Sequence, residues 1–301
     1  MFTHISKVQD ENGNPIETPE IEKISLGAYH SILMESGGKR RMFGCGLNNT
    51  GCLGLGDCSD RVTMTVIPQD AFEGVVVDVR CGYSHTIFLS NTGRVYGCGQ
   101  NYEGQLSEDP RDMPSCKVPR ELKLPSEIRA LQINCGFSST VIVGSDHNVY
   151  VCGGNAHGSL AIPLVESDQI CSLTKISWFD AHYQHTLIAP NDFVTRVHCG
   201  ISHTLFETFQ GRLFGNGSNM KRQLGREEKL LFTSEPLEII LPKKKNSVHS
   251  NRVWCVCPFS NYSFCVEKVR EREVKSMMHR LLESAFSSKF SFEDIVFAFL
   301  E

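Results

Sequence analysis

Apolar residues recur along the chain in short runs, and glycine or asparagine closes most of them. Thr86–Leu89 is one such run; it ends at the turn Asn91–Gly93 and is followed by Arg94–Tyr96. Two apolar runs joined by a short Asn/Gly turn are typical of a β-hairpin. The runs Val62–Ile67 and Val75–Val79 predict two further strands before that hairpin. The pattern thus predicts an all-β protein built from many short strands.

The same succession of residues occurs several times along the 301-residue chain. Four copies begin at Leu26, Cys81, Cys135 and Cys199, and an incomplete fifth copy begins at Cys257. The copies follow one another at steps of 55, 54, 64 and 58 residues. Self-similarity at such a period indicates a repeat architecture. About four strands per repeat is the content of one β-propeller blade.

The second copy shows the motif in full. It contains Cys81-Gly82-Tyr83-Ser84-His85-Thr86, then a hairpin, and then Asn101-Tyr102-Glu103-Gly104-Gln105-Leu106. This order of residues resembles the regulator of chromosome condensation repeat. The resemblance covers residues 24–266 and implies a β-propeller, whose ring usually has seven blades, with each sequence repeat staggered against the blade it helps to build.

This chain is too short for seven blades at its own repeat length. We predict about four full blades, near residues 42–90, 95–145, 149–208 and 213–266, after a leading half-repeat near residues 24–35. Three explanations stay open: fewer blades close the ring, another chain caps the arc, or the chain is a fragment. Open strand edges favour association, so we expect self-association as one outcome.

Three domains are predicted. Residues 1–23 form a polar, acidic N-terminal segment, residues 24–266 form the propeller, and residues 267–301 form a C-terminal region. The spacing of apolar residues predicts an amphipathic helix over 267–288, and residues 290–300 read as a strand. This region is either a cap over the open propeller edge or the start of a BTB domain, whose first strand the segment 289–297 resembles.

Composition excludes some classes of function. The net charge of -4 gives no attraction to nucleic acid, and residues 1–25, with Lys7 and Lys23 against five acidic residues, should repel DNA. We find no long apolar run and no secretory signal core, so we expect no membrane span and a location in the cytoplasm or the nucleus. The 13 cysteines, seven of which sit at two repeat positions, are interpreted as buried, reduced thiols. No metal, cofactor or catalytic residue is predicted.

Three histidines, His30, His85 and His203, occupy one repeat position. Histidine titrates near neutral pH and is a frequent catalytic residue. The repeat, however, places the three in different blades instead of one site. We expect a structural role, in which each histidine forms a local hydrogen bond with the Thr or Ser beside it and fastens its own blade.

Two segments are candidates for partner binding. The connection between Leu160 and Cys199 is about ten residues longer than its counterparts and contains Trp178, Phe179, His182 and Tyr183. Aromatic residues on such a loop favour a protein interface, and an ordinary core strand is the alternative. The basic run Lys39, Arg40 and Arg41 is either a solvated loop or a contact for an acidic partner.

Three functions remain. The first is a non-enzymatic interaction propeller that presents its loops to a protein partner. The second, which the resemblance implies, is guanine-nucleotide exchange on a Ran-type small GTPase. The third is a substrate adaptor for ubiquitin ligation, which requires a BTB domain. A fold alone cannot decide among them, because propellers carry many functions.

Overall fold

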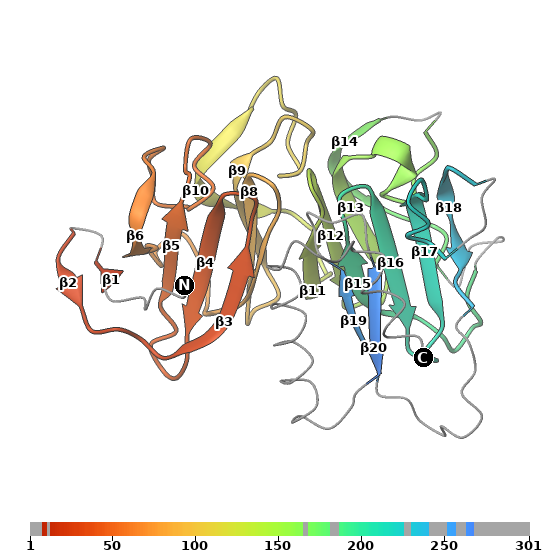
Figure 1. Cartoon of the computed structure of the whole chain (residues 1–301), viewed down its shortest axis with the longest axis horizontal. Coiled ribbons are helices and arrows are strands. Elements are labelled where there is room, and N and C mark those ends of the chain that lie inside the picture. Colours follow the sequence, from red (N-terminus) through yellow and green to blue (C-terminus); the bar gives the residue numbers. More distant parts are fainter. Residues whose placement is uncertain are drawn as a thin grey trace, which may run out of the picture. The chain divides into compact units, whose positions relative to one another are not determined.

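The computed structural model describes residues 8–10, 13–164, 168–180, 187–225, 230–240, 252–256 and 263–267. Four sheets follow one another along this part of the chain, and each contains four consecutive antiparallel strands (Figure 1). We number these sheets blades 1 to 4. The predicted all-β propeller fold is confirmed. Within the described residues the one helix is a short 3-10 turn, η1 (Ala156–Gly158).

The bounds of the strands repeat closely from blade to blade. Blade 1 contains β3 (Ile21–Leu26), β4 (His30–Glu35), β5 (Met42–Gly46) and β6 (Arg61–Val66). Blade 2 contains β7 (Val76–Cys81), β8 (His85–Ser90), β9 (Val95–Gln100) and β10 (Ser115–Leu122). Blade 3 contains β11 (Ala130–Cys135), β12 (Ser139–Gly144), β13 (Val149–Gly154) and β14 (Gln169–Lys175). Blade 4 contains β15 (Val194–Cys199), β16 (His203–Thr208), β17 (Leu213–Ser218) and β18 (Phe232–Glu238).

The division of the chain into blades differs from the sequence prediction. The predicted boundary at residues 90–95 separates β8 from β9, but these strands pair directly, with Phe88 opposite Tyr96. The leading half-repeat likewise supplies β3 and β4, the first two strands of blade 1. Each blade therefore begins one strand before the His position of the repeat. The prediction was wrong because it divided the chain at the turn of a hairpin, although hairpin strands pair with each other.

Short strands lie outside the four blades. β1 (Val8–Gln9) pairs in parallel with β6 and antiparallel with β2 (Pro15–Ile16), so the predicted N-terminal segment adds two strands to blade 1. β19 (Arg252–Val256) and β20 (Ser263–Glu267) form a two-stranded sheet. The four blades lie in one compact unit of the chain, and most of β19 and β20 lies in a second. The predicted C-terminal helix, strand and BTB resemblance fall outside the described residues, apart from Glu267, which ends β20.

The hydrophobic core lies between the blades. Ile32 and Met34 of β4 pack in one cluster with Val79 of β7 and Phe88 of β8, which joins blade 1 to blade 2. Similar clusters join blade 2 to blade 3 and blade 3 to blade 4. Because each sheet is apolar on both faces, burial of these faces requires a neighbouring blade on either side. Stability is thus largely a property of the junctions between blades.

Candidate protein-interaction site

His30 and His85 each reach across a blade junction. His30 of blade 1 places Nε2 2.9 Å from Oγ1 of Thr86 in blade 2, and His85 of blade 2 places Nε2 3.4 Å from Oγ1 of Thr140 in blade 3. The sequence prediction of a bond within one blade was wrong. The adjacent Thr points to the opposite face of its strand, because side chains alternate along a strand, and so meets the preceding blade.

The same threonines donate to the preceding blade. Thr86 Oγ1 donates to the carbonyl oxygen of Cys52 at 2.7 Å, and Thr140 Oγ1 donates to that of Gln105 at 2.7 Å. The hydroxyl has one proton, so the histidine Nε2–H must donate to the oxygen. Thr204 repeats the bond to a carbonyl at the third junction, to Ser159 at 2.7 Å. Here the preceding blade carries Ser139 in place of histidine.

Burial keeps these histidines neutral. Desolvation lowers the pKa of His30 to about 4, of His85 to about 3 and of His203 to about 4. The Nδ1 atom of His85 is buried without a hydrogen-bond partner, so a proton added there would be an unpaired buried donor. A histidine with this pKa is a poor general base at neutral pH. The prediction that the three histidines lie in separate blades is confirmed, since they begin β4, β8 and β16.

The repeat glycine before each histidine is required by the imidazole ring. A Cβ on Gly82 would collide with the ring of His85 and would lie 2.8 Å from the carbonyl oxygen of Gly136 in the next blade. Gly27 and Gly200 stand in the same relation to His30 and His203. The Gly-x-x-His motif therefore allows the backbone at the glycine to pack closely against the buried imidazole ring.

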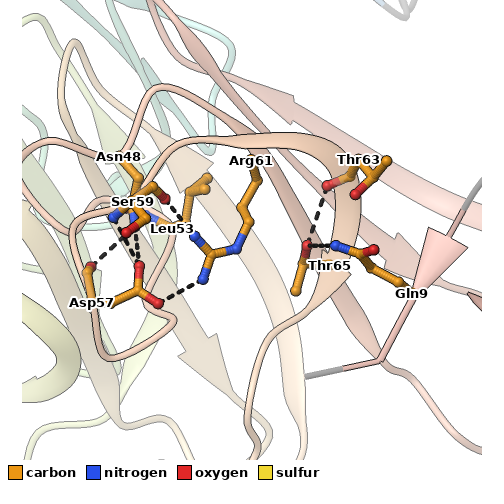
Figure 2. A network of polar contacts seen from close by, with 8 residues as sticks. All are labelled: Gln9, Asn48, Leu53, Asp57, Ser59, Arg61, Thr63 and Thr65. Carbon is orange, nitrogen blue, oxygen red and sulfur yellow. Dashed lines mark hydrogen bonds and ion pairs between the residues drawn. The ribbon is translucent and has the colours of Figure 1, made fainter. Parts of the chain in front are cut away.

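The repeat asparagine holds the loop between the third and fourth strands. In blade 1, Asn48 Oδ1 accepts from the backbone N–H of Leu53 at 2.9 Å, and Asn48 Nδ2 donates to the carbonyl oxygen of Asp57 at 3.0 Å (Figure 2). The Asp57 carboxylate in turn binds Ser59 N–H and the Arg61 guanidinium, whose hydrogen bond lowers the pKa of Asp57. Asn101, Asn155 and Asn219 make the same bond to the leucine five residues on, at 2.8, 3.0 and 3.1 Å.

The motif glycines, histidines and asparagines thus form the scaffold of each blade. The aromatic side chains between the glycine and the histidine or serine lie at the surface. Tyr29, Tyr83 and Phe137 lie on the short turns between the first and second strands of blades 1, 2 and 3. The ring centroids of Tyr29 and Tyr83 are 5.8 Å apart, and those of Tyr83 and Phe137 are 4.3 Å apart. Tyr29 and Phe137 are exposed. We call these three residues the aromatic row.

Backbone hydrogen bonds connect the turns that carry the aromatic row. Tyr83 N–H donates to the carbonyl oxygen of Phe137 at 2.9 Å, and Ala28 N–H donates to that of Tyr83 at 3.3 Å. Hydrogen bonding with Tyr29 raises the pKa of the Tyr83 phenol. The rings are therefore held by three successive blades on one rigid surface. These residues were not predicted from the sequence; their signal was an aromatic residue between the glycine and the histidine or serine of the motif.

Two of the predicted aromatic residues are described, and both contribute to the core. Phe179 is buried, with its ring centroid 4.7 Å from that of Phe206 and 5.5 Å from that of Phe214. Trp178 is half-buried, and its Nε1–H donates to the carbonyl oxygen of Ala161 at 2.8 Å. His182 and Tyr183 fall outside the described residues. Partner binding by this segment stays a prediction. Phe179 itself packs in the core and is not exposed to a partner.

The predicted basic residues lie on the turn between β4 and β5, at the end of blade 1 opposite the aromatic row. Arg41 donates to the Glu35 carboxylate at 2.6 and 2.9 Å, and its guanidinium lies 5.5 Å from the ring centroid of Phe43. Arg41 thereby lowers the pKa of Glu35. Arg40 lies 3.5 Å from Glu22, and Lys39 is exposed. Arg41 is thus engaged within the blade, whereas Lys39 is available to a partner.

No group of three or more histidine, cysteine or acidic residues in the described ranges is arranged to hold a metal ion. In the same ranges, no helix has the length and apolar character that a bilayer crossing requires. Of the repeat-position cysteines that the structure describes, Cys45 is half-buried and the other five, Cys81, Cys98, Cys135, Cys152 and Cys199, are buried. Desolvation raises the pKa of Cys152 to about 12 and that of Cys81 to about 11. Such thiols stay protonated and unreactive at neutral pH.

Comparison with known families agrees with this architecture. Residues 41–89 and 92–143 match the model of the regulator of chromosome condensation (RCC1) repeat, and residues 76–105 match a second model of that repeat. The chain carries RCC1 repeats. The matched residues include His85 of the junctions and Asn48 and Asn101 of the loops.

Several proteins with known names are similar to the chain. The ultraviolet-B receptor UVR8 of Arabidopsis thaliana is 30% identical over 205 residues, which are 68% of this chain and 43% of that protein. The serine/threonine-protein kinase Nek8 of Danio rerio is 28% identical over 211 residues, or 68% of this chain and 29% of that protein. The chain therefore spans less than half the length of these relatives.

Solved structures share the fold. Prp20p from Saccharomyces cerevisiae, whose structure was described together with its binding to Gsp1p and histones, superposes with a TM-score of 0.60 at 16% identity, over 90% of this chain and 62% of that one. Human WBSCR16 superposes with a TM-score of 0.54 at 19% identity, over 85% of this chain and 76% of that one. At these identities the likeness concerns the arrangement of RCC1-type blades.

Proposed function

We propose that this protein is a non-enzymatic interaction propeller that binds a protein partner through the blade end bearing the aromatic row. The observation that carries the proposal is the set of three adjacent rings, two of them exposed, on turns locked together by backbone hydrogen bonds. Aromatic side chains on a rigid support lose little entropy on binding and are frequent energetic centres of interfaces.

The proposal is tested with the partner recovered from the source cell by affinity capture and then purified. Phe137→Ala and Tyr29→Ala should each weaken binding at least about tenfold, as measured by calorimetry. Their melting temperatures should stay close to that of the parent protein, because both side chains are exposed. Unchanged affinity in both variants would show that this end of the blades is not the binding surface.

Two variants separate surface from scaffold. Lys39→Glu combined with Arg40→Glu changes the basic turn at the opposite end. Weaker binding in this variant alone would assign the partner to that turn, which the sequence left as an alternative to a solvated loop. His85→Ala removes a buried junction residue and should lower the melting temperature. At temperatures where this variant is folded, its affinity for the partner should equal that of the parent protein.

Guanine-nucleotide exchange is the alternative function. Its support is the fold shared with Prp20p, which is described with its binding to Gsp1p. It predicts that the purified chain accelerates release of labelled guanine nucleotide from a small GTPase of the Ran type. If the chain does not accelerate nucleotide release from any member of a panel of small GTPases, exchange is excluded for that panel and the interaction propeller is favoured. A ubiquitin-ligase adaptor would require a BTB domain, and detection of such a domain in the transcript would favour that function.

A further inference from the structure

The loops around the aromatic row are acidic. In each blade the loop between the third and fourth strands leaves the sheet beside the turn that carries a ring, because the start of the second strand pairs with the end of the third, as His85 pairs with Gly99. In blades 1 to 3 the described residues of these loops contain seven acidic residues and one basic residue, Arg111. The acidic residues are Asp57, Asp60, Glu103, Glu108, Asp109, Asp112 and Asp168.

The opposite end of the same blades has no such excess. Its turns and connections carry six basic and four acidic residues. They comprise residues 36–41, 67–75, 91–94, 123–129 and 145–148. The negative charge of the connecting segments is therefore concentrated at the end that bears the aromatic row.

Hydrogen bonds hold two of the acidic residues close to the turns with the rings. In blade 1, Asn48 follows the residue whose N–H donates to the carbonyl oxygen of Tyr29 at 2.8 Å, and the Asn48 N–H itself donates to Asp60 Oδ1 at 2.8 Å. In blade 3, the N–H of Asn155 donates to the carbonyl oxygen of Asp168 at 2.7 Å. Asp60 and Asp168 are both exposed, so each presents its carboxylate to solvent near a ring.

Glu103 of blade 2 lies beside the turn that carries Phe137 in blade 3. A Cβ added at Gly154 would lie 3.5 Å from Cβ and Cγ of Glu103 and 2.6 Å from Oγ of Ser138, the residue after Phe137. The Glu103 carboxylate also accepts from the amide of Gln169 in blade 3, at 2.7 Å. A carboxylate of one blade is thus held next to a ring of the following blade.

Most of these carboxylates have no cation of the chain beside them. Asp57 pairs with Arg61, and Asp109 pairs with Arg111, each at 2.6 Å. The other five form no ion pair within the part of the chain that the structure describes. A surface with such an excess of negative charge attracts a cationic partner and repels an anionic one.

We propose that the aromatic row binds a basic segment of a protein partner, in which arginine side chains lie over the rings and donate to the surrounding carboxylates. This inference rests on the proposed function and adds the chemistry of the partner. The face of an aromatic ring attracts a cation that lies within about 6 Å of its centroid. The guanidinium group of arginine is flat, stacks on aromatic rings and donates two parallel hydrogen bonds to a carboxylate. An apolar segment would cover the rings but would remove water from the carboxylates without replacing its hydrogen bonds.

Fluorescence anisotropy of a labelled peptide made of Arg-Ser-Gly repeats, added to the full chain, tests the proposal. The peptide should bind, and its affinity should fall as the salt concentration rises, because salt screens exposed charges. A peptide of Glu-Ser-Gly repeats should not bind. Equal binding of the two peptides, or no binding of the arginine peptide at the highest attainable concentrations, would overturn the proposal.

A charge variant locates the binding surface. It combines the isosteric amide substitutions Asp60→Asn, Glu103→Gln and Asp168→Asn. Each substitution keeps an acceptor oxygen and removes a negative charge, so the variant should fold as the parent does and bind the arginine peptide at least about tenfold more weakly. The matched control removes the same number of charges at the opposite end, by Asp70→Asn, Glu73→Gln and Glu127→Gln, and should bind as the parent does. Equal weakening in the two variants would show that only net charge matters and would overturn the proposal.

Nuclear magnetic resonance keeps the test decisive if the charge variant does not fold. A spin-labelled arginine peptide bound to the parent protein should broaden the amide resonances of residues 27–29, 82–84 and 136–138 more than those of residues 36–41. Stronger broadening at residues 36–41 would place the peptide at the other end of the blades and overturn the proposal.

Phe137→Ala distinguishes a failure of this inference from a failure of the proposed function. If the captured partner binds both Phe137→Ala and the charge variant more weakly, the basic segment is supported. If Phe137→Ala weakens binding and the charge variant does not, the aromatic row is the binding surface but its partner segment is not basic. If neither change weakens binding, both the surface and the chemistry assigned to it are wrong.

Discussion

Thr86 Oγ1 lies 2.9 Å from Nε2 of His30 and donates to the carbonyl oxygen of Cys52 at 2.7 Å. One hydroxyl of blade 2 is therefore held by two separate elements of blade 1, a strand and a loop. Thr140 repeats this arrangement between blades 2 and 3. The most regular residues of the repeat thus determine how neighbouring blades are joined, and four predictions follow from their geometry.

Thr86→Val removes the junction hydroxyl and keeps the shape of the side chain. The variant leaves the His30 Nε2–H unsatisfied in a buried site and leaves the Cys52 carbonyl with only the weak Cys98 thiol donor. This should lower the free energy of unfolding by about 2–4 kcal/mol. Urea unfolding measures the change. Thr174→Val is the control, because Thr174 makes a local bond on the outer strand β14, and it should change stability by less than about 0.5 kcal/mol. Equal effects would refute the junction role.

Stability should fall on mild acidification. The pKa values of His30, His85 and His203 in the folded protein, about 4, 3 and 4, lie below the ordinary value of 6.5. As pH falls from 6.5 toward 4, the unfolded chain binds protons at these sites and the folded chain does not. Each histidine therefore removes up to about 1.4 kcal/mol of stability per pH unit in this window. Below the folded pKa values the loss levels off.

Urea unfolding midpoints measured between pH 7 and pH 5 test this linkage. His85→Gln should have a shallower pH dependence than the parent protein, because one proton-linked group is lost. Its stability at pH 7 should also be lower, since the bond to Thr140 is changed. A midpoint that does not vary with pH in the parent protein would contradict the buried, neutral state of these rings.

Gly82→Ala should destabilise the protein by about 2–4 kcal/mol, because the added Cβ collides with the His85 ring and approaches the carbonyl oxygen of Gly136. Gly38→Ala provides the contrast. A Cβ at Gly38 meets nothing within 4 Å, so this variant should be neutral or slightly more stable. Thermal unfolding of the two variants checks the difference. Similar melting temperatures would show that the Gly-x-x-His packing is not tight.

Asn101→Asp should loosen the loop between β9 and β10. Asn101 Nδ2 donates to the carbonyl oxygens of Glu108 and Met113, at 2.9 and 2.7 Å, and a carboxylate cannot donate to either. We expect a loss of about 2 kcal/mol or more in unfolding free energy. Hydrogen exchange of the Leu106 amide, which donates to Asn101 Oδ1, should accelerate. Asn49→Asp in blade 1 is the control, because Asn49 is exposed next to the repeat asparagine. It should leave hydrogen exchange of the Leu53 amide unchanged.

Much of the fold could be predicted from local signals. The hairpin of β8 and β9 and the strands β6 and β7 lie where the apolar runs placed them, because alternation and Asn/Gly turns act within a few residues. The separation of the three histidines followed from the repeat period alone. The aromatic row could not be predicted in this way, since its rings meet only when turns about 54 residues apart come together.

The candidate binding segments show the same limit. The sequence left Phe179 as either an interface aromatic on a loop or a core residue; the structure packs it against Phe206 and Phe214, which belong to the next repeat. Arg41 reads as part of a free basic run, yet Glu35 and Phe43 engage it. The contacts of Phe179 come from residues far along the chain, whereas those of Arg41 form within the hairpin of β4 and β5.

Repeat period, alternation of apolar residues and turn residues are local properties of the chain, and they suffice to predict a protein of repeated short strands. Tertiary structure decided where one blade ends and the next begins, and that histidine and threonine bond across that boundary. The reason is that blades 1 to 4 carry apolar residues on both faces, so pairing and burial are settled together by contacts between segments far apart in the chain.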